Sequence, residues 1–387
     1  MDISLIRAQI PALSQAIYLN TGTCGPLPRA ALEVMQKELA QEGEEGRIRP
    51  EGFAAMKARM AELRRLLGRI VGAQEEEVAL TSNATHGVNI VLWGLDWQKR
   101  DEILTTDAEH AGVLAPLRAL SQRFDLEVRL AEVSRARDEE EMLLAVEKAI
   151  TSKTRLFCLS HVTYSTGACL PLEKIAGLAQ KRQIPVLADG AQSAGAIALD
   201  LSSLGVDFYA FPGQKWLLGP EGTGGLYVKR SGLLRLLPAF AGYFSADPAS
   251  ICASDPARLS FWPDARRFES ASLFRPGISG LAASAAWLLS LGMEDITSRT
   301  QDLARLARQK LLKIPGVDVL TPEPHRGLVN FRIPKDPAQA VAALAQEGIL
   351  IRSIPDNQSL RFSCGFFNTE EEIEKAVWAI ARLIGKG

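Results

Sequence analysis

Short apolar runs alternate with helical patterns along the middle of the chain. The runs have the length and the apolar content of buried strands. They lie at residues 77–80, 102–105, 126–130, 155–159, 185–188, 207–211 and 225–228. Between them, apolar residues recur at i, i+3 and i+4, which predicts helices at residues 85–95, 110–124, 139–150 and 172–182. This alternation predicts an α/β fold with a mainly parallel seven-stranded sheet.

The pattern changes after Gly242. Residues 246–266 are rich in Pro, Ser, Ala and Asp without a clear period, which predicts a long irregular excursion. We expect a large α/β domain at residues 15–285 and a smaller α+β domain at residues 286–387, with residues 1–14 packed on the smaller one. The smaller domain is predicted from helices at 278–291, 295–313, 339–346 and 370–383 and strands at 327–333 and 360–364.

The composition predicts an ordinary globular protein with a large core, since 47% of its 387 residues are hydrophobic and 23% are charged. A formal net charge of -1 without a long basic run argues against nucleic acid or a membrane surface as the partner. We find no secretory signal and no run of about 18 apolar residues, and therefore expect a cytoplasmic protein. Five widely spaced cysteines predict neither a disulfide framework nor a metal site.

Two reactive side chains follow successive predicted strands. Asp189 comes directly after the strand at 185–188, and Lys215 follows the strand at 207–211. An amine and a carboxylate at one edge of a sheet suit pyridoxal 5′-phosphate (PLP), because the lysine can form an imine with its aldehyde and the acid can keep its ring nitrogen protonated. Taken singly, Asp189 could be a helix N-cap and Lys215 a solvated loop residue. Together they predict a PLP site.

Two further segments could complete that site. The segment 81–89, TSNATHGVN, lies between a strand and a helix, where backbone N–H groups and the hydroxyl of Thr85 could bind a phosphate, although such residues also start helices without a ligand. His110 follows the strand at 102–105, and its ring could lie on a planar cofactor while its nitrogens exchange protons. The histidines expected to be structural are His86, His161 and His325.

Arg352 and Arg361 lie nine positions apart at the ends of two short apolar runs. If the turn between them folds back, both guanidinium groups reach one cleft, where they would suit the α-carboxylate of an amino acid. The nearby acidic run at 370–372 leaves surface ion pairing open as an alternative for both.

A set of motifs spans nearly the whole chain. In order, they are YLNTGTCGPLP, TSNATHGVN, DAEHAGV, VLADGAQSAG, DFYAFPGQKWLLGPEGTGGLYV, FESAS and LRFSCGFFNTEEEI. The set resembles class V, fold-type I PLP enzymes, the group that contains cysteine desulfurases and isopenicillin N epimerase-like proteins. Within that group it is most similar to the cysteine/cystine C–S lyase branch.

The resemblance implies a role for each matching residue. Lys215 would carry the cofactor as a Schiff base, Asp189 would pair with the pyridinium nitrogen and His110 would stack on the ring. Because Ser272 would reach the phosphate of the neighbouring subunit, the family implies a homodimer. The other implied contacts are Ala84, Thr85 and Gln214 near the phosphate, Gln192 on the phenolic oxygen, and Arg352, Arg361 and Tyr164 around the substrate.

The chain also departs from the family pattern. Gln214 stands where relatives usually have a phosphate-contacting His, Pro212 where they have Ser or Thr, and Tyr164 where desulfurases have Asn. Desulfurases carry a nucleophilic cysteine on a long loop between the two arginines, whereas here the segment 353–360 has none. Cys364 is expected to be buried, so a persulfide-forming desulfurase is disfavoured.

The resemblance implies a lyase that removes sulfur from the β-carbon of cystine or cysteine and releases pyruvate, ammonia and a persulfide or sulfide. Transamination, epimerisation and desulfuration share its first steps and stay open as alternatives. A non-catalytic protein of the same fold also stays open. The segment GPEGTGG is a weak sign of a nicotinamide-dependent oxidoreductase, because it precedes a strand instead of following one.

Overall fold

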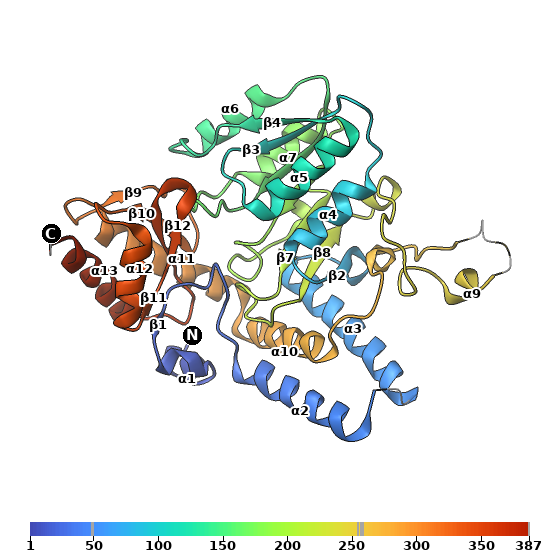
Figure 1. Ribbon diagram of the computed structural model, residues 1–387, viewed down its shortest axis with the longest axis horizontal. Coiled ribbons are helices and arrows are strands. Elements are labelled where there is room, and N and C mark those ends of the chain that lie inside the picture. The colour runs from blue at the N-terminus through green and yellow to red at the C-terminus, as the bar shows by residue number, and fades with distance from the viewer. Residues whose placement is uncertain (48–49, 254, 256–258, 386–387) are drawn as a thin grey trace.

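The computed structural model describes residues 1–47, 50–253, 255 and 259–385. The predicted seven-stranded sheet is present, in the order β2-β8-β7-β6-β5-β3-β4. Its strands are β2 (Val78–Thr81), β3 (Glu102–Thr106), β4 (Glu127–Ala131), β5 (Thr154–Ser160), β6 (Val186–Asp189), β7 (Phe208–Pro212) and β8 (Gly224–Val228). Neighbouring strands are parallel except for β8, which is antiparallel to both β2 and β7. This confirms the α/β fold and the mainly parallel sheet (Figure 1).

Helices cover both faces of this sheet. Successive strand residues point to opposite faces, so Leu156 and Cys158 of β5 join one apolar cluster, whereas Phe157 and Leu159 join another. The first cluster includes α4 (Ala84–Gly94) and α5 (Ala111–Phe124), and the second includes α3 (Pro50–Val71), α6 (Glu139–Ala149), α7 (Leu172–Gln180) and α10 (Arg275–Leu291). Burial on both faces explains the continuous apolar runs of inner strands such as β5, whereas the edge strand β4 is largely exposed.

The C-terminal part has its own sheet and core. The antiparallel sheet has the order β12-β13-β10-β9, and its apolar side chains pack against α11, α12 and α13. The strands are β9 (Asp318–Val319), β10 (Leu328–Arg332), β12 (Arg352–Ile354) and β13 (Ser359–Ser363), and the helices are α11 (Met293–Leu311), α12 (Pro337–Gln346) and α13 (Glu370–Gly385). The proposed domain boundary at 285/286 falls within α10.

The N-terminal segment joins this C-terminal part. From α1 (Ile3–Ala8), Arg7 donates to the Phe367 carbonyl over 2.9 Å and forms an ion pair with Glu372 at 2.7 Å. The strand β1 (Ile17–Tyr18) pairs in parallel with β11 (Ile349–Leu350). We therefore propose that the large domain starts after Tyr18 rather than at residue 15.

Some helices carry no clear signal in the sequence. The helix α2 (Arg29–Glu45) buries only Ala31 and Glu38, so it shows little apolar periodicity. The excursion at 246–266 contains the short helix α9 (Pro248–Ile251), and Figure 1 shows it reaching away from the body of the protein. Within that excursion, residues 254 and 256–258 are outside the described residues. The remaining short helix is α8 (Leu201–Leu204).

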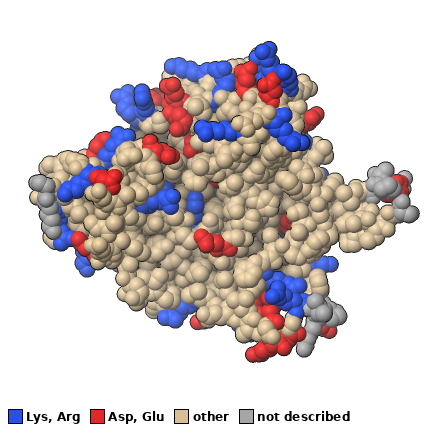
Figure 2. Space-filling model, viewed as in Figure 1, with Lys and Arg blue, Asp and Glu red and all other residues tan. Residues whose placement is uncertain are grey.

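Charged side chains of both signs are intermixed on the face seen in Figure 2. No single helix of the described chain combines the length and hydropathy of a membrane span. The helices α10 and α11 reach these values only as a pair, and they are bent by 83° relative to each other.

Candidate active site

The predicted amine and carboxylate come together at the carboxyl ends of two neighbouring strands. Asp189 is the last residue of β6, Lys215 follows β7, and the two strands are parallel. Asp189 is 7% exposed and accepts a hydrogen bond of 2.9 Å from the Ala191 amide. The next helix, α8, begins only at Leu201. Asp189 is therefore not a helix N-cap.

Asp189 and Lys215 lie close enough to influence each other's ionisation. Burial raises the pKa of Asp189, and the charge of Lys215 opposes this rise. Burial also lowers the pKa of Lys215 to about 8; Asp189 opposes the fall, whereas Arg361 and Arg352 add to it. A lowered pKa increases the fraction of neutral amine, the form that attacks an aldehyde.

The start of α4 offers free backbone donors. Asn83 caps the helix by accepting from the His86 amide over 2.8 Å. We find no acceptor among the described residues for the amides of Ala84 and Thr85, as expected for the first turn of a helix. A Cβ atom added at Gly112 would lie 2.5 Å from the Thr85 hydroxyl and 3.1 Å from the His110 ring. The structure therefore brings the predicted phosphate site next to His110.

His110 starts α5 and is held in one orientation. Its Nδ1 accepts from the Gly112 amide over 3.0 Å, and its ring meets the Tyr164 ring edge-on, with centroids 4.8 Å apart. Burial and the nearby charge of Lys215 lower the pKa of His110 to about 4. The ring is therefore neutral at pH 7, and because Nδ1 accepts, its proton is on Nε2.

The two predicted glutamines differ in their contacts. Gln192 is buried, donates to the Gly22 carbonyl and accepts from the Trp216 indole, each over 2.9 Å. One amide proton of Gln192 remains for the predicted contact with the cofactor. The side-chain oxygen of Gln214 is buried without a partner in the described chain. This oxygen can accept a hydrogen bond from a donor group, but it cannot donate one to a phosphate.

Arg352 and Arg361 face each other directly across the β12–β13 pair. Both donate to the Thr23 hydroxyl over 3.2 Å, and Arg361 also donates to the Tyr164 carbonyl over 3.3 Å. Arg361 is only 2% exposed, and burial, with the charge of Arg352, lowers its pKa to about 9. Like charges opposite each other are unfavourable unless an anion lies between them.

The alternative of surface ion pairing does not hold for these arginines. Neither has a carboxylate partner among the residues that the structure describes, and the acidic run pairs elsewhere: Glu370 with Arg299 and Glu372 with Arg7. Two guanidinium groups without a carboxylate partner are suited to bind an anion such as a carboxylate, and this role stays a prediction.

The N-terminal loop 20–25 forms a wall of the site that the sequence analysis did not assign. Thr23 binds both arginines and donates to Asn20 over 2.7 Å. There is no room for side chains at Gly22 and Gly25, since a Cβ there would lie 2.8 Å from Gln192 and 2.1 Å from the Lys215 carbonyl. The paired glycines in NTGTCG were the signal that could have revealed this close packing.

Two cysteines bear on the chemistry of the site. Cys24, in the same loop, is half-buried, and burial and Glu221 raise the pKa of its thiol although Lys215 opposes this. Cys364 is buried as predicted, and burial raises its pKa to about 12. Neither is favoured as a thiolate at neutral pH.

Ser272 is exposed and stands apart from these groups. It is hydrogen-bonded to the Tyr243 hydroxyl through both its side chain and its amide. Its role across a subunit interface stays a prediction.

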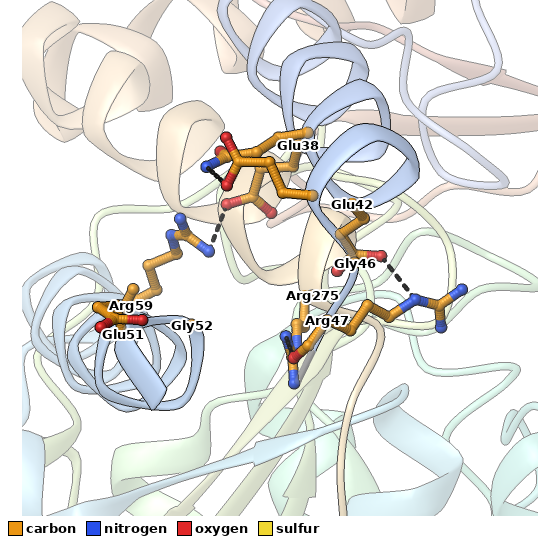
Figure 3. A pocket seen from close by; sticks show the side chains of 11 residues that line it. Glu38, Glu42, Gly46, Arg47, Glu51, Gly52, Arg59 and Arg275 are labelled. Atoms are coloured by element: carbon orange, nitrogen blue, oxygen red, sulfur yellow. Dashed lines mark hydrogen bonds and ion pairs between the residues drawn. The ribbon is translucent and has the colours of Figure 1, made fainter. Parts of the chain in front are cut away.

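A separate hollow of about 280 Å³ lies between α2, α3 and α10 (Figure 3). Its charged groups largely pair with each other: Glu38 binds Arg59 at 2.7 Å, and Glu42 binds Arg47 at 3.2 Å. None of the predicted site residues lines it.

Comparison with known proteins identifies the family. The family described as aminotransferase class-V matches residues 17–376. The chain belongs to this family. It is 32% identical to isopenicillin N epimerase of Streptomyces clavuligerus over 96% of this chain and 95% of that protein. It is 29% identical to a cysteine desulfurase of Salmonella typhimurium over 84% of this chain and 82% of the relative.

Solved structures agree with this membership. The cystine C–S lyase C-DES, in complex with its reaction product cysteine persulfide, superposes with a TM-score of 0.91 at 32% identity, covering 96% of this chain and 99% of that one. A lysine variant of C-DES carries glycine covalently linked to its PLP cofactor. The prediction of a PLP-dependent enzyme from the class V group of carbon–sulfur lyases is confirmed at the level of the family.

The residues of this site fit PLP. Lys215 and Asp189 supply the amine and the acid, and the free amides at the start of α4 suit a phosphate group. His110 and Tyr164 would border the ring and the substrate. Of the predicted site residues, only Ser272 lies apart.

Proposed function

We propose that this enzyme cleaves the bond between sulfur and the β-carbon of cystine or cysteine, and releases pyruvate, ammonia and a persulfide or sulfide. The observation that carries the proposal is the arginine pair at Thr23, an α-carboxylate receptor next to a lysine whose pKa is lowered to about 8. This arrangement suits an α-amino acid whose α-proton is to be removed.

Each residue has a distinct task in this proposal. Arg352 and Arg361 hold the substrate carboxylate and so fix the α-carbon beside Lys215. Lys215 would hold the cofactor, and its Nζ, when neutral and free, would accept the α-proton. Asp189 keeps a proton on the ring nitrogen through its negative charge. When bound, PLP withdraws electrons from the α-carbon.

The surroundings of the sulfur favour release over transfer. The turn between β12 and β13 contains no cysteine. Of the cysteines described above, Cys24 is the one whose thiol interacts electrostatically with Lys215. The raised pKa of Cys24 keeps this thiol protonated. Without a thiolate acceptor, the sulfur leaves the enzyme in the product. For the cystine C–S lyase C-DES, the reaction product is described as cysteine persulfide.

Epimerisation is a second candidate, because isopenicillin N epimerase is as similar in sequence as C-DES. Both reactions need the same α-proton transfer and differ in whether a β-bond then breaks. Purified enzyme should be mixed with cystine, cysteine and β-unsubstituted amino acids, and pyruvate and D-amino acids should be measured. Pyruvate from cystine supports the lyase. Racemised amino acid without pyruvate would reject it in favour of the epimerase, and the Lys215→Ala variant should lose both products.

We also propose a homodimer in the cytoplasm. Several large apolar side chains are exposed in the segments before and after Ser272, and one of them, Tyr243, is hydrogen-bonded to it: Leu234, Leu237, Phe240, Tyr243 and Phe274. A monomer rarely exposes so many together, and a second copy would bury them. Light scattering of the purified protein should give twice the mass of the 387-residue chain, and a monomeric mass would contradict the proposal.

A further inference from the structure

Glu109 is a buried carboxyl that the proposed chemistry does not use. It lies in the turn between β3 and α5, directly before His110, and is 3% exposed. Its carboxylate accepts three hydrogen bonds: one from the Thr106 hydroxyl at 2.6 Å, one from the Ser160 amide at 2.9 Å and one from the Ser160 hydroxyl at 2.6 Å. It therefore ties the end of β3 to the end of β5.

Both ends of this connection lead to cofactor-binding residues. Ser160 is the last residue of β5 and the register partner of Asp189 on β6, and the His161 amide donates to the Asp189 carbonyl over 3.0 Å. On the other side, the Thr106 hydroxyl also accepts from the Ala108 amide over 3.3 Å, which shapes the turn that presents His110. One side chain thus connects the strand end next to Asp189 with the turn that presents His110.

The charge of Glu109 is poorly compensated. No Lys or Arg of the described chain forms an ion pair with it. The titratable groups that interact with its charge are Asp189 from β6 and Cys158 from β5, and His110 is its neighbour in the chain. Burial raises the pKa of Glu109 to about 7, the bonds from Ser160 and Thr106 oppose this, and Asp189 adds to it. Since the pKa of His110 is lowered to about 4, Glu109 changes charge in a pH range in which His110 stays neutral.

We propose that Glu109 is a positioning residue for the cofactor: its carboxyl sets the placement of His110 relative to Asp189, and its proton changes the field that both experience. This inference rests on the PLP site of the proposed function but not on the choice between lyase and epimerase. Glu109 acts through Ser160 and Thr106, because its own carboxyl group is enclosed between the strand ends.

The chain provides a matched control for this proposal. Glu102 begins the same strand, is equally buried, and accepts from Thr151 over 2.5 Å. It lies at the opposite end of β3, away from the carboxyl edge of the sheet. The variants Glu109→Gln and Glu102→Gln therefore each remove one buried carboxylate, one in the turn after β3 and one at the start of β3, at two different distances from the cofactor residues.

The test is a pH titration of the holoprotein labelled with ¹³C at histidine. With only four histidines, the His110 ring signal can be assigned by single substitutions. In the parent protein, this signal should shift with a midpoint of about 7. The shift should disappear in Glu109→Gln and persist in Glu102→Gln. If the same shift persists in Glu109→Gln, it belongs to another group and the proposal is wrong.

A second variant keeps the test decisive if Glu109→Gln does not fold. Ser160→Ala keeps the carboxyl but removes one hydrogen bond to it, so the midpoint of the His110 shift should move to higher pH, because that bond favours the charged form. An unchanged midpoint would overturn the proposal. Since the readout is a chemical shift, this outcome is separate from any failure of the enzyme to release pyruvate.

Discussion

The Thr23 hydroxyl is the point at which the carboxylate receptor can be tested most directly. The Thr23→Val change keeps the shape of the side chain and removes the acceptor shared by Arg352 and Arg361. It also removes the donor to Asn20. The two guanidinium groups would then lose the atom that holds them in a common fork.

The structure sets the size of the expected effect. A hydrogen bond to a charged group contributes about 1.5–3 kcal/mol, and bonds of 3.2 Å are at the long end of the range, so the lower value applies. Arg352 is exposed and contributes little, whereas Arg361 is buried. A loss of about 1.5 kcal/mol corresponds to roughly a tenfold rise in KM for the amino acid, with kcat little changed.

Thr21 provides the control for this experiment. It lies in the same loop and is buried, but its hydroxyl has no partner among the described residues. Thr21→Val should leave KM unchanged and raise the free energy of unfolding by about 1 kcal/mol, because an unsatisfied hydroxyl is removed. Steady-state kinetics and urea unfolding of both variants measure these effects. A KM for Thr23→Val within a factor of about two of the parent would refute the receptor.

Three further predictions concern stability and the cofactor. Arg64→Ala should lower the free energy of unfolding by about 3–5 kcal/mol in urea titrations, because it leaves the buried Glu269 without its bidentate partner at 2.6 and 2.8 Å. The neighbouring variant Arg65→Ala loses only an exposed ion pair with Glu62, so its free energy of unfolding should change little. The rate at which apoprotein takes up PLP should rise with pH and level off above about 8, because neutral Lys215 then becomes the main form. An ordinary lysine has a pKa of about 10.4, so a rate that keeps rising up to pH 10 would contradict the lowered pKa of Lys215. Gln214→His introduces the residue usual in relatives and removes a buried oxygen that has no partner in the described chain, so it should slow PLP dissociation by roughly five- to tenfold in dialysis, and faster loss would contradict this.

The sequence predicted the parts of the site that follow local rules. Most strands of the large sheet are apolar runs, Asp189 ends one of them and Lys215 follows the next, so their meeting could be inferred if these two strands pair in parallel. For the arginine pair, the spacing left a shared cleft and surface ion pairing open, and the register of β12 and β13 shows the two residues opposite each other. The phosphate end of the site was predicted from the residues that begin α4.

What escaped prediction depends on contacts between distant segments. Thr23 meets Arg352 across 329 positions of sequence, and no local pattern indicates such a contact. Glu109 acquires its environment only because β3 and β5 are neighbours, an order that the alternation of strands and helices leaves open. The helix α2 was missed because it is largely exposed and lacks an apolar stripe.

The pairing of β1 with β11 has a consequence for the order in which the protein is made. Residues 17–25 leave the ribosome early, yet the strand and the arginines that they contact are encoded more than three hundred positions later. Contacts of such long range form late in folding. A nascent chain can thus complete its large sheet while its substrate receptor is still unbuilt, and the enzyme gains its full binding site only after synthesis has reached the last strands.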